Sequence, residues 1–172
     1  YRLNQQRPAQ RFSLGLTGLD GSIYPLSHGD TPSSMILVSR NNQSFAFFGD
    51  TGPDEVEKSK NLDTVWRMLG DEVKAQRLKG LIIETSYPDG VPDSKLFGHL
   101  TPDWLLKELG TLQQYAGGEG SLKGLTVIIS HVKPSLKAGA DPEQAIMAQL
   151  EKGNNLGVNF VRMAQGDKLE IK

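Results

Sequence analysis

Short apolar runs separated by turn residues predict strands in the first 50 residues of the chain. Residues 11–16 (RFSLGL) and 21–26 (GSIYPL) are typical of two short strands that are joined by a GLDG bend. Residues 34–40 (SMILVSR) and 44–49 (SFAFFG) predict a hairpin, because the Asn residues of the intervening NNQ tolerate the positive φ angles that a tight turn requires. We therefore expect the chain to begin with β-structure.

Beyond residue 50, segments with helical spacing alternate with continuous apolar runs. Apolar positions predict one helix over residues 53–78, which Gly70 could interrupt. Thr101 and Asp141 are typical helix caps, each followed by a proline suited to the first turn. The remaining predicted elements are helices over residues 101–115 and 141–153, strands over 78–85 and 125–130, and a closing strand pair over 159–172. This alternation predicts an α/β protein in layers, with strands buried on both faces.

The organisation of the chain favours one domain over residues 1–172. It has no internal repeat or linker, and its one glycine-rich break, residues 116–124, lies between a predicted helix and a predicted strand. The longest apolar runs have the length of strands, so we expect a soluble protein without a membrane span and leave the compartment open between periplasm and cytoplasm. The chain begins at Tyr1 without a leader pattern, which indicates a processed product or a fragment.

Charge and cysteine content narrow the chemistry. The chain carries 19 basic and 20 acidic residues, and no run of Lys or Arg forms a basic stripe, which disfavours a nucleic-acid partner. Because the chain has no cysteine, disulfides, thiolate zinc sites and a cysteine nucleophile are excluded. Any metal site must therefore use carboxylates and the three histidines, which are His28, His99 and His131.

Polar residues that could carry chemistry follow the predicted strands. Asp50, Glu84 and His131 each take the first polar position after an apolar run, and His28 follows SIYPLS in the same manner. His99 lies in the loop that leads into the helix predicted over residues 101–115. Because ligands bind at the carboxyl ends of strands in open α/β sheets, we expect these side chains to meet at one edge.

Each of these residues also has an ordinary structural interpretation. Asp50 suits a turn, because Asp-Thr-Gly-Pro is common loop chemistry, and Glu84 could orient the neighbouring backbone or support a histidine. A histidine in a loop is commonly a surface residue, and Lys133 is either solvated or a phosphate contact. The sequence has neither HxH nor HExxH, so spacing alone does not establish a metal site.

Five blocks, read in order, carry a specific resemblance. They are YPLSHG, FFGDTGPD, LIIETSYP, LFGHLTPDWLLKEL and IISHVKP, and together they resemble the C-terminal half of the class II cyclic-nucleotide phosphodiesterases, a family of the metallo-β-lactamase superfamily. The resemblance implies an αββα sandwich, of which this chain would hold the C-terminal portion, a mixed sheet with flanking helices. It also implies hydrolysis of 3′,5′-cyclic AMP to 5′-AMP by a hydroxide that two metal ions activate, with cyclic GMP left open as a second substrate.

The resemblance assigns expected roles to individual residues. His28, Asp50 and His131 are similar to metal ligands, with Asp50 bridging two Zn²⁺ ions, although other divalent metals remain open. His99 is similar to a catalytic histidine near the phosphate, and Glu84 to the acid that supports such a histidine. Lys133 and Thr51 are expected to contact the substrate.

The HxHxDH segment that supplies the family's other ligands does not occur in this chain. We therefore expect the chain alone to be inactive and to need an N-terminal half as its partner, and a homodimer is left open.

Two alternatives to the phosphodiesterase function remain. One is a tRNA 3′-processing endoribonuclease of the same superfamily, which the near-neutral charge and GHLTP disfavour. The other is a non-catalytic module that binds metal or nucleotide.

Overall fold

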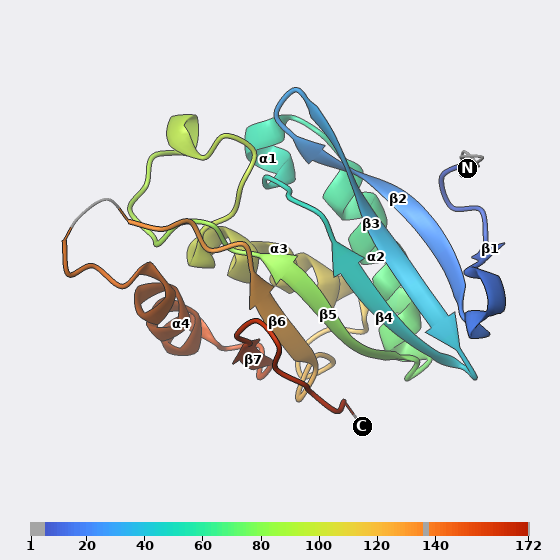
Figure 1. Ribbon diagram of the computed structural model, residues 1–172. Coiled ribbons are helices and arrows are strands. Elements are labelled where there is room, and N and C mark those ends of the chain that lie inside the picture. Colours follow the sequence, from blue (N-terminus) through green and yellow to red (C-terminus); the bar gives the residue numbers. More distant parts are fainter. Residues whose placement is uncertain (1–5, 136–137, 172) are drawn as a thin grey trace.

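The computed structural model describes residues 6–135 and 138–171, and seven strands within these ranges form one mixed sheet in the order β1 to β7 (Figure 1). The first four strands pair antiparallel; they are β1 (Phe12–Ser13), β2 (Asp20–His28), β3 (Thr31–Arg40) and β4 (Gln43–Phe48). The sheet then continues parallel to β4 with three strands, which are β5 (Leu78–Glu84), β6 (Thr126–Ser130) and β7 (Asn159–Arg162). Because β2 and β4 run in the same direction as β5 and β6, the carboxyl ends of all four strands lie at one edge.

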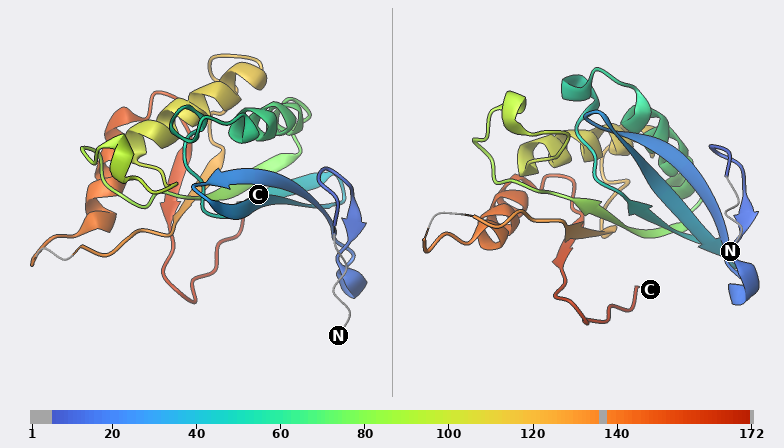
Figure 2. Two further views of the ribbon diagram at one scale, coloured as in Figure 1. Left: turned by 90° about the horizontal axis from the view of Figure 1, so that it is seen from above. Right: turned by 45° about the horizontal axis from the view of Figure 1, so that its top comes forward.

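The helices cover one face of this sheet. Helices α2 (Asn61–Lys74), α3 (Pro102–Tyr115) and α4 (Pro142–Gly153) pack on that face, and the C-terminal tail crosses the other (Figure 2). The side chains of Thr101 and Asp141 accept hydrogen bonds from the backbone amides of Trp104 and Gln144, so both predicted caps are confirmed. No helix in the described ranges has the length and apolar character needed to cross a membrane.

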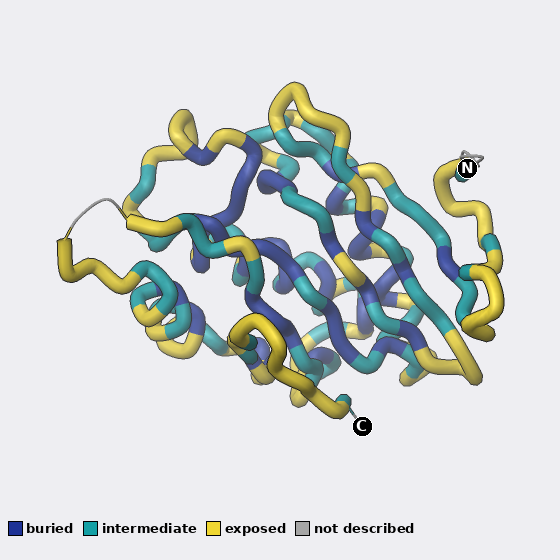
Figure 3. The backbone as a smooth tube through the Cα atoms, in the orientation of Figure 1, coloured by how far each residue is buried: buried dark blue, intermediate teal, exposed yellow. Residues whose placement is uncertain are grey.

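Burial alternates along the central strands, as can be followed in Figure 3. Met35 and Ala46 face the helices and are fully buried, whereas Ile36 and Phe47 point to the opposite face, where Phe47 is 52% exposed. The expectation that the strands are buried on both faces was therefore wrong for this part of the sheet. The reason is that side chains alternate across a strand while the helices of the described residues lie on one side only.

The segment predicted as one helix forms two. Helix α1 (Asp54–Glu57) ends at Lys58, which has φ +54°, and α2 begins at Asn61. The carboxylate of Asp54, in the preceding helix, accepts hydrogen bonds from the amides of Leu62 and Asp63. It thereby satisfies two backbone amides in the first turn of α2 that have no partner within the helix. Gly70 does not interrupt the helix, as it could have done, because α2 continues through that residue to Lys74.

Both ends of the chain hold less sheet than predicted. Residues 11–16 form the two-residue strand β1 and the 3₁₀ turn η1 (Gly15–Thr17). The closing strand pair was wrong, since residues 163–171 form no strand and Lys172 lies outside the described residues. The carboxylate of Asp167 instead accepts a hydrogen bond from the amide of Ala164, which closes a local turn. The predicted hairpin is confirmed, with Asn41 and Asn42 at φ +49° and +61°.

Gly70 permits the close approach of α2 and α3. A Cβ atom at Gly70 would lie 2.6 Å from Cβ of Tyr115, whereas one at Gly110, inside α3, would meet nothing within 4 Å. We expect Gly70→Ala to lower the free energy of unfolding by about 1–3 kcal/mol through overpacking. Gly110→Ala is the matched control, and its better helix propensity should raise stability by about 0.5–1 kcal/mol. Urea unfolding of both variants checks this, and an unchanged midpoint for Gly70→Ala would contradict the packing explanation.

Candidate metal centre

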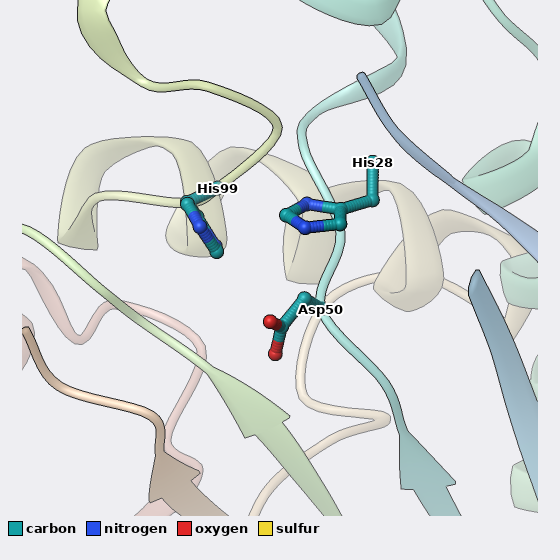
Figure 4. A group of neighbouring side chains, drawn as sticks. All are labelled: His28, Asp50 and His99. Carbon is teal, nitrogen blue, oxygen red and sulfur yellow. The ribbon is translucent and has the colours of Figure 1, made fainter. Parts of the chain in front are cut away.

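Three side chains from separate segments converge at the carboxyl edge of the sheet (Figure 4). His28 ends β2, Asp50 follows β4 by two residues, and His99 comes from the loop before α3. One potential ligand atom of each lies within 4.8 Å of those of the other two. Imidazole nitrogens and a carboxylate oxygen are the ligand types that zinc and related divalent ions accept, so this group could hold a metal ion.

His131 stands at the rim of this group. Its Nδ1 atom lies 3.4 Å from Oδ1 of Asp50, and its ring stacks on that of His99 with centroids 5.3 Å apart. The residue directly follows β6 and has φ +54°, a conformation that is uncommon for a residue other than glycine. The backbone therefore turns sharply where the imidazole meets Asp50, and the side chain stays 39% exposed.

Hydrogen bonds orient two of the imidazoles in the same way. Nδ1 of His28 lies 2.9 Å from the carbonyl oxygen of Gly98, and Nδ1 of His99 lies 2.7 Å from Oε1 of Glu84. A carbonyl oxygen and a carboxylate only accept, so each Nδ1 must be the protonated donor. In a neutral ring Nε2 then keeps its lone pair, which is the usual arrangement of a metal-binding histidine and its supporting acceptor, whereas in an imidazolium Nε2 carries a second proton.

Glu84 connects the loop of His99 to that of Asp50. Its side chain is 1% exposed, and besides His99 it accepts hydrogen bonds from the hydroxyl of Ser86 (2.7 Å), the amide of Thr51 (3.2 Å) and the amide of Leu100 (3.4 Å). A buried carboxylate needs several donors to offset its lost hydration, and these four supply them. The contact between Glu84 and a histidine that the sequence suggested is present, and its catalytic role stays a prediction.

The loop after Asp50 also holds the end of β2. The amide of Gly52 and the hydroxyl of Thr51 donate to the carbonyl oxygen of Ser27 at 2.9 and 3.2 Å, and Glu57 accepts from the amide of Gly29 at 2.8 Å. These hydrogen bonds hold the backbone at Ser27 and at Gly29, on both sides of His28. The strand end that carries one candidate ligand is thus anchored to the loop that carries another.

A buried acid lies behind this loop. Oε2 of Glu108 in α3 accepts a hydrogen bond of 2.7 Å from the indole of Trp66, and burial raises the pKa of Glu108. The amide of Asp54 donates to the other oxygen at 3.4 Å. Glu108 therefore joins α2 and α3 to the start of α1, outside the candidate metal group.

The two expected substrate contacts stay predictions. Thr51 is fully buried beside Asp50, and its hydroxyl donates a hydrogen bond to the carbonyl oxygen of Ser27, so it supports the Asp50 loop. Lys133 lines a cavity of 430 Å³ together with Asp141 and Glu143 at the start of α4. Sequence reasoning did not single out Gly98, whose only signal was its place immediately before His99.

Comparison with known proteins agrees with the resemblance of the five sequence blocks. The family model described as "cAMP phosphodiesterases class-II" matches residues 22–166. A probable 3′,5′-cyclic-nucleotide phosphodiesterase of Yersinia pestis is 60% identical over 172 residues, which cover the whole of this chain and 50% of that protein. The chain thus spans about half the length of the curated relatives it matches.

Solved structures show the fold. Unliganded yeast PDE1 superposes with a TM-score of 0.82 at 24% identity, over 93% of this chain and 48% of that one. The metallo-β-lactamase fold protein YhfI of Bacillus subtilis superposes with a TM-score of 0.58 at 10% identity, over 90% of this chain and 51% of that one. The seven-stranded mixed sheet with its helices is therefore part of a metallo-β-lactamase fold, as predicted. With its family model matched over most of its length, this chain belongs to the class II cAMP phosphodiesterases.

Proposed function

We propose that this chain forms the C-terminal portion of an enzyme that hydrolyses 3′,5′-cyclic AMP to 5′-AMP, with cyclic GMP as an open second substrate. The observation that carries the proposal is the convergence of His28, Asp50 and His99 at one edge of the sheet in a member of this family. The three residues come from segments far apart in the sequence, and hydrogen bonds hold their rings and backbone in place. Such pre-organisation is expected of a catalytic site and unnecessary on an ordinary surface.

His28, Asp50 and His131 are the proposed metal ligands, with Zn²⁺ as the proposed ion and Asp50 shared between two ions. When bound, divalent ions at this place would supply Lewis-acid stabilisation of the phosphoryl group and a water that ionises near neutral pH. Asp50 is close to both proposed histidine ligands, because its Oδ1 lies 3.4 Å from Nδ1 of His131 and a carboxylate oxygen lies within 4.8 Å of a ring nitrogen of His28. Further ligands would come from a segment outside this chain.

His99 is the proposed proton donor to the leaving group. In the reaction an oxygen of water bonds to phosphorus and its released proton passes to solvent, while the bond between phosphorus and the 3′-oxygen breaks. His99, in its imidazolium form, gives the proton on Nε2 to the departing 3′-oxygen and regains one from solvent. Glu84 holds the ring through Nδ1 at 2.7 Å, and the edge of Tyr87 packs against it with centroids 5.9 Å apart. These contacts hold the ring, which extends toward the side on which Asp50 lies (Figure 4).

The open face of the sheet supports the proposal of a missing partner segment. Ile36, Phe47 and Ile82 occupy neighbouring positions on three strands, on the face away from the helices, and Phe47 is 52% exposed. A contiguous apolar surface on a sheet normally packs against another layer. We propose that the N-terminal half of the enzyme covers this face and brings the remaining ligands to the edge where Asp50 lies.

The chain alone should be inactive. We expect a protein of the relatives' full length to convert 3′,5′-cyclic AMP to 5′-AMP, while the 172-residue chain at equal concentration and with added Zn²⁺ gives no turnover, because His28, Asp50 and His131 are too few for two catalytic ions. Turnover is measured as the amount of 5′-AMP formed, after chromatography that separates it from 3′-AMP.

Turnover by the chain alone would contradict the need for a partner segment. Cleavage of a precursor tRNA by the long protein, without hydrolysis of cyclic AMP, would favour the nuclease instead. A long protein that holds fewer than about one metal ion per chain after dialysis would favour a non-catalytic module, because a catalytic zinc is held by about three protein ligands and is retained.

A further inference from the structure

Gly98 touches a candidate metal ligand from a distant part of the chain. Its carbonyl oxygen lies 2.9 Å from Nδ1 of His28, which is 70 residues away in the sequence. The adjacent residue, His99, belongs to the same candidate group and is held through its own Nδ1 by Glu84. The loop thus orients one imidazole through the carbonyl of Gly98 and supplies the other as His99, and the two ring centroids are 4.7 Å apart.

Only glycine fits this position. Gly98 has φ +81°, and a Cβ atom there would lie 2.7 Å from the carbonyl carbon of His28, from its Nδ1 and from the amide nitrogen of Gly29. Two of these three atoms are backbone, and the Glu57 carboxylate holds the amide of Gly29 at 2.8 Å. The end of β2 therefore cannot move to make room for a larger residue at position 98 without losing the hydrogen bond between Gly29 and Glu57.

The loop around Gly98 is fixed on both sides. Leu96 is fully buried, and its carbonyl accepts a hydrogen bond from the amide of His99 at 3.1 Å. On the other side, the carbonyl oxygen of Leu100 accepts from the amide of Ser86 at 3.0 Å. The carbonyl of Gly98 is thus presented to His28 by a backbone that has little freedom to move.

We propose that Gly98 is a positioning residue that selects which nitrogen of His28 binds metal. By accepting the proton on Nδ1, its carbonyl keeps Nε2 of His28 unprotonated and directed to the group that Asp50 and His99 complete. The absence of a side chain at Gly98 allows the approach that this hydrogen bond needs. The inference rests on the proposed metal centre and adds to it a residue that is not itself a ligand.

The tautomer of His28 tests the inference without any substitution. In the metal-free 172-residue chain, labelled with ¹⁵N and held at a pH where the ring is neutral, long-range ¹H–¹⁵N correlation spectra distinguish a protonated Nδ1 from a protonated Nε2. We expect His28 to show a protonated Nδ1 and an unprotonated Nε2. A His28 that carries its proton on Nε2 would overturn the proposal.

A matched pair of variants tests the consequence for metal binding. Gly98→Ala places a methyl group against His28, whereas Gly90→Ala, in the same connection between β5 and α3 and at φ +93°, meets nothing within 4 Å. Loss of a supporting contact to a metal-binding histidine typically weakens affinity about 10- to 100-fold, and we expect this for Gly98→Ala but not for Gly90→Ala. Titration of the full-length variants with Co²⁺, followed by its visible absorption, measures the dissociation constant.

The outcomes separate this inference from the proposed function. Equal Co²⁺ affinity in Gly98→Ala and Gly90→Ala, with both variants folded by circular dichroism, would overturn the positioning role. Loss of folding in Gly98→Ala leaves the decision to the tautomer of the unmodified chain. Absence of Co²⁺ binding by the unmodified full-length protein, together with a protonated Nδ1 on His28, would count against the metal centre and not against the His28–Gly98 hydrogen bond.

Discussion

Replacement of Asp50 by alanine is expected to remove metal and activity together. Asp50 is the only carboxylate of the candidate group in the described residues, and its ligand atom lies within 4.8 Å of those of His28 and His99. Its Oδ1 atom also lies 3.4 Å from Nδ1 of His131. Without it, neutral imidazoles alone would face a divalent ion. We expect metal affinity to fall by more than the roughly 10- to 100-fold that loss of a supporting contact costs, because a direct ligand is removed. Metal analysis after dialysis and assay of the full-length protein measure the two losses.

Asp30→Ala is the control for this substitution. Asp30 is an exposed carboxylate two residues from His28 and is not a member of the candidate group. Its removal changes the local charge by the same amount as Asp50→Ala, so it separates general electrostatics from direct coordination. Full metal content in Asp50→Ala, or an equal loss in Asp30→Ala, would argue against Asp50 as a ligand.

Replacement of His99 by alanine should separate metal binding from catalysis. As a proton donor, His99 should contribute about 10²- to 10⁴-fold to turnover, while His28, Asp50 and His131 continue to hold the metal. We therefore expect metal content close to that of the unmodified protein and a large fall in kcat. Glu84→Gln should lower kcat as well, because an amide cannot hold the imidazole with a full negative charge.

The alternative outcome is informative because His99 is one of the three residues whose ligand atoms lie within 4.8 Å of one another. If His99→Ala loses its metal in proportion to its activity, His99 is a ligand and the proton donor must be sought elsewhere. Unchanged turnover would remove His99 from the mechanism altogether.

Local patterns predicted much of the fold because their causes are local. Thr101 and Asp141 cap the two helices that were expected after them, and two asparagines with positive φ turn the predicted hairpin. The site could be anticipated at one edge because polar residues follow apolar runs, and the carboxyl ends of strands that run in one direction share an edge. This rule selected His28 and Asp50, whereas His99, in the loop before α3, took its expected role from the resemblance to the family.

The features that were wrong or missed depend on distant contacts. Gly70 lies inside α2, where its missing side chain makes room for Tyr115, which lies 45 positions further along the chain. The apolar run of β5 was interpreted as buried on both faces, although Ile82 points away from the helices that cover Ile83. The support that Gly98 gives to His28 comes from a backbone carbonyl, which leaves no trace in the residue type.

The most direct test of the account is the position of a metal ion relative to Asp50. Crystals of the chain grown with Zn²⁺ and measured at the zinc absorption edge should show an anomalous peak about 2.0–2.2 Å from a carboxylate oxygen of Asp50 and from Nε2 of His28. A peak located away from both side chains would contradict the claim that these residues form a metal centre. The absence of a peak, at a Zn²⁺ concentration for which the dissociation constant predicts an occupied site, would contradict it as well.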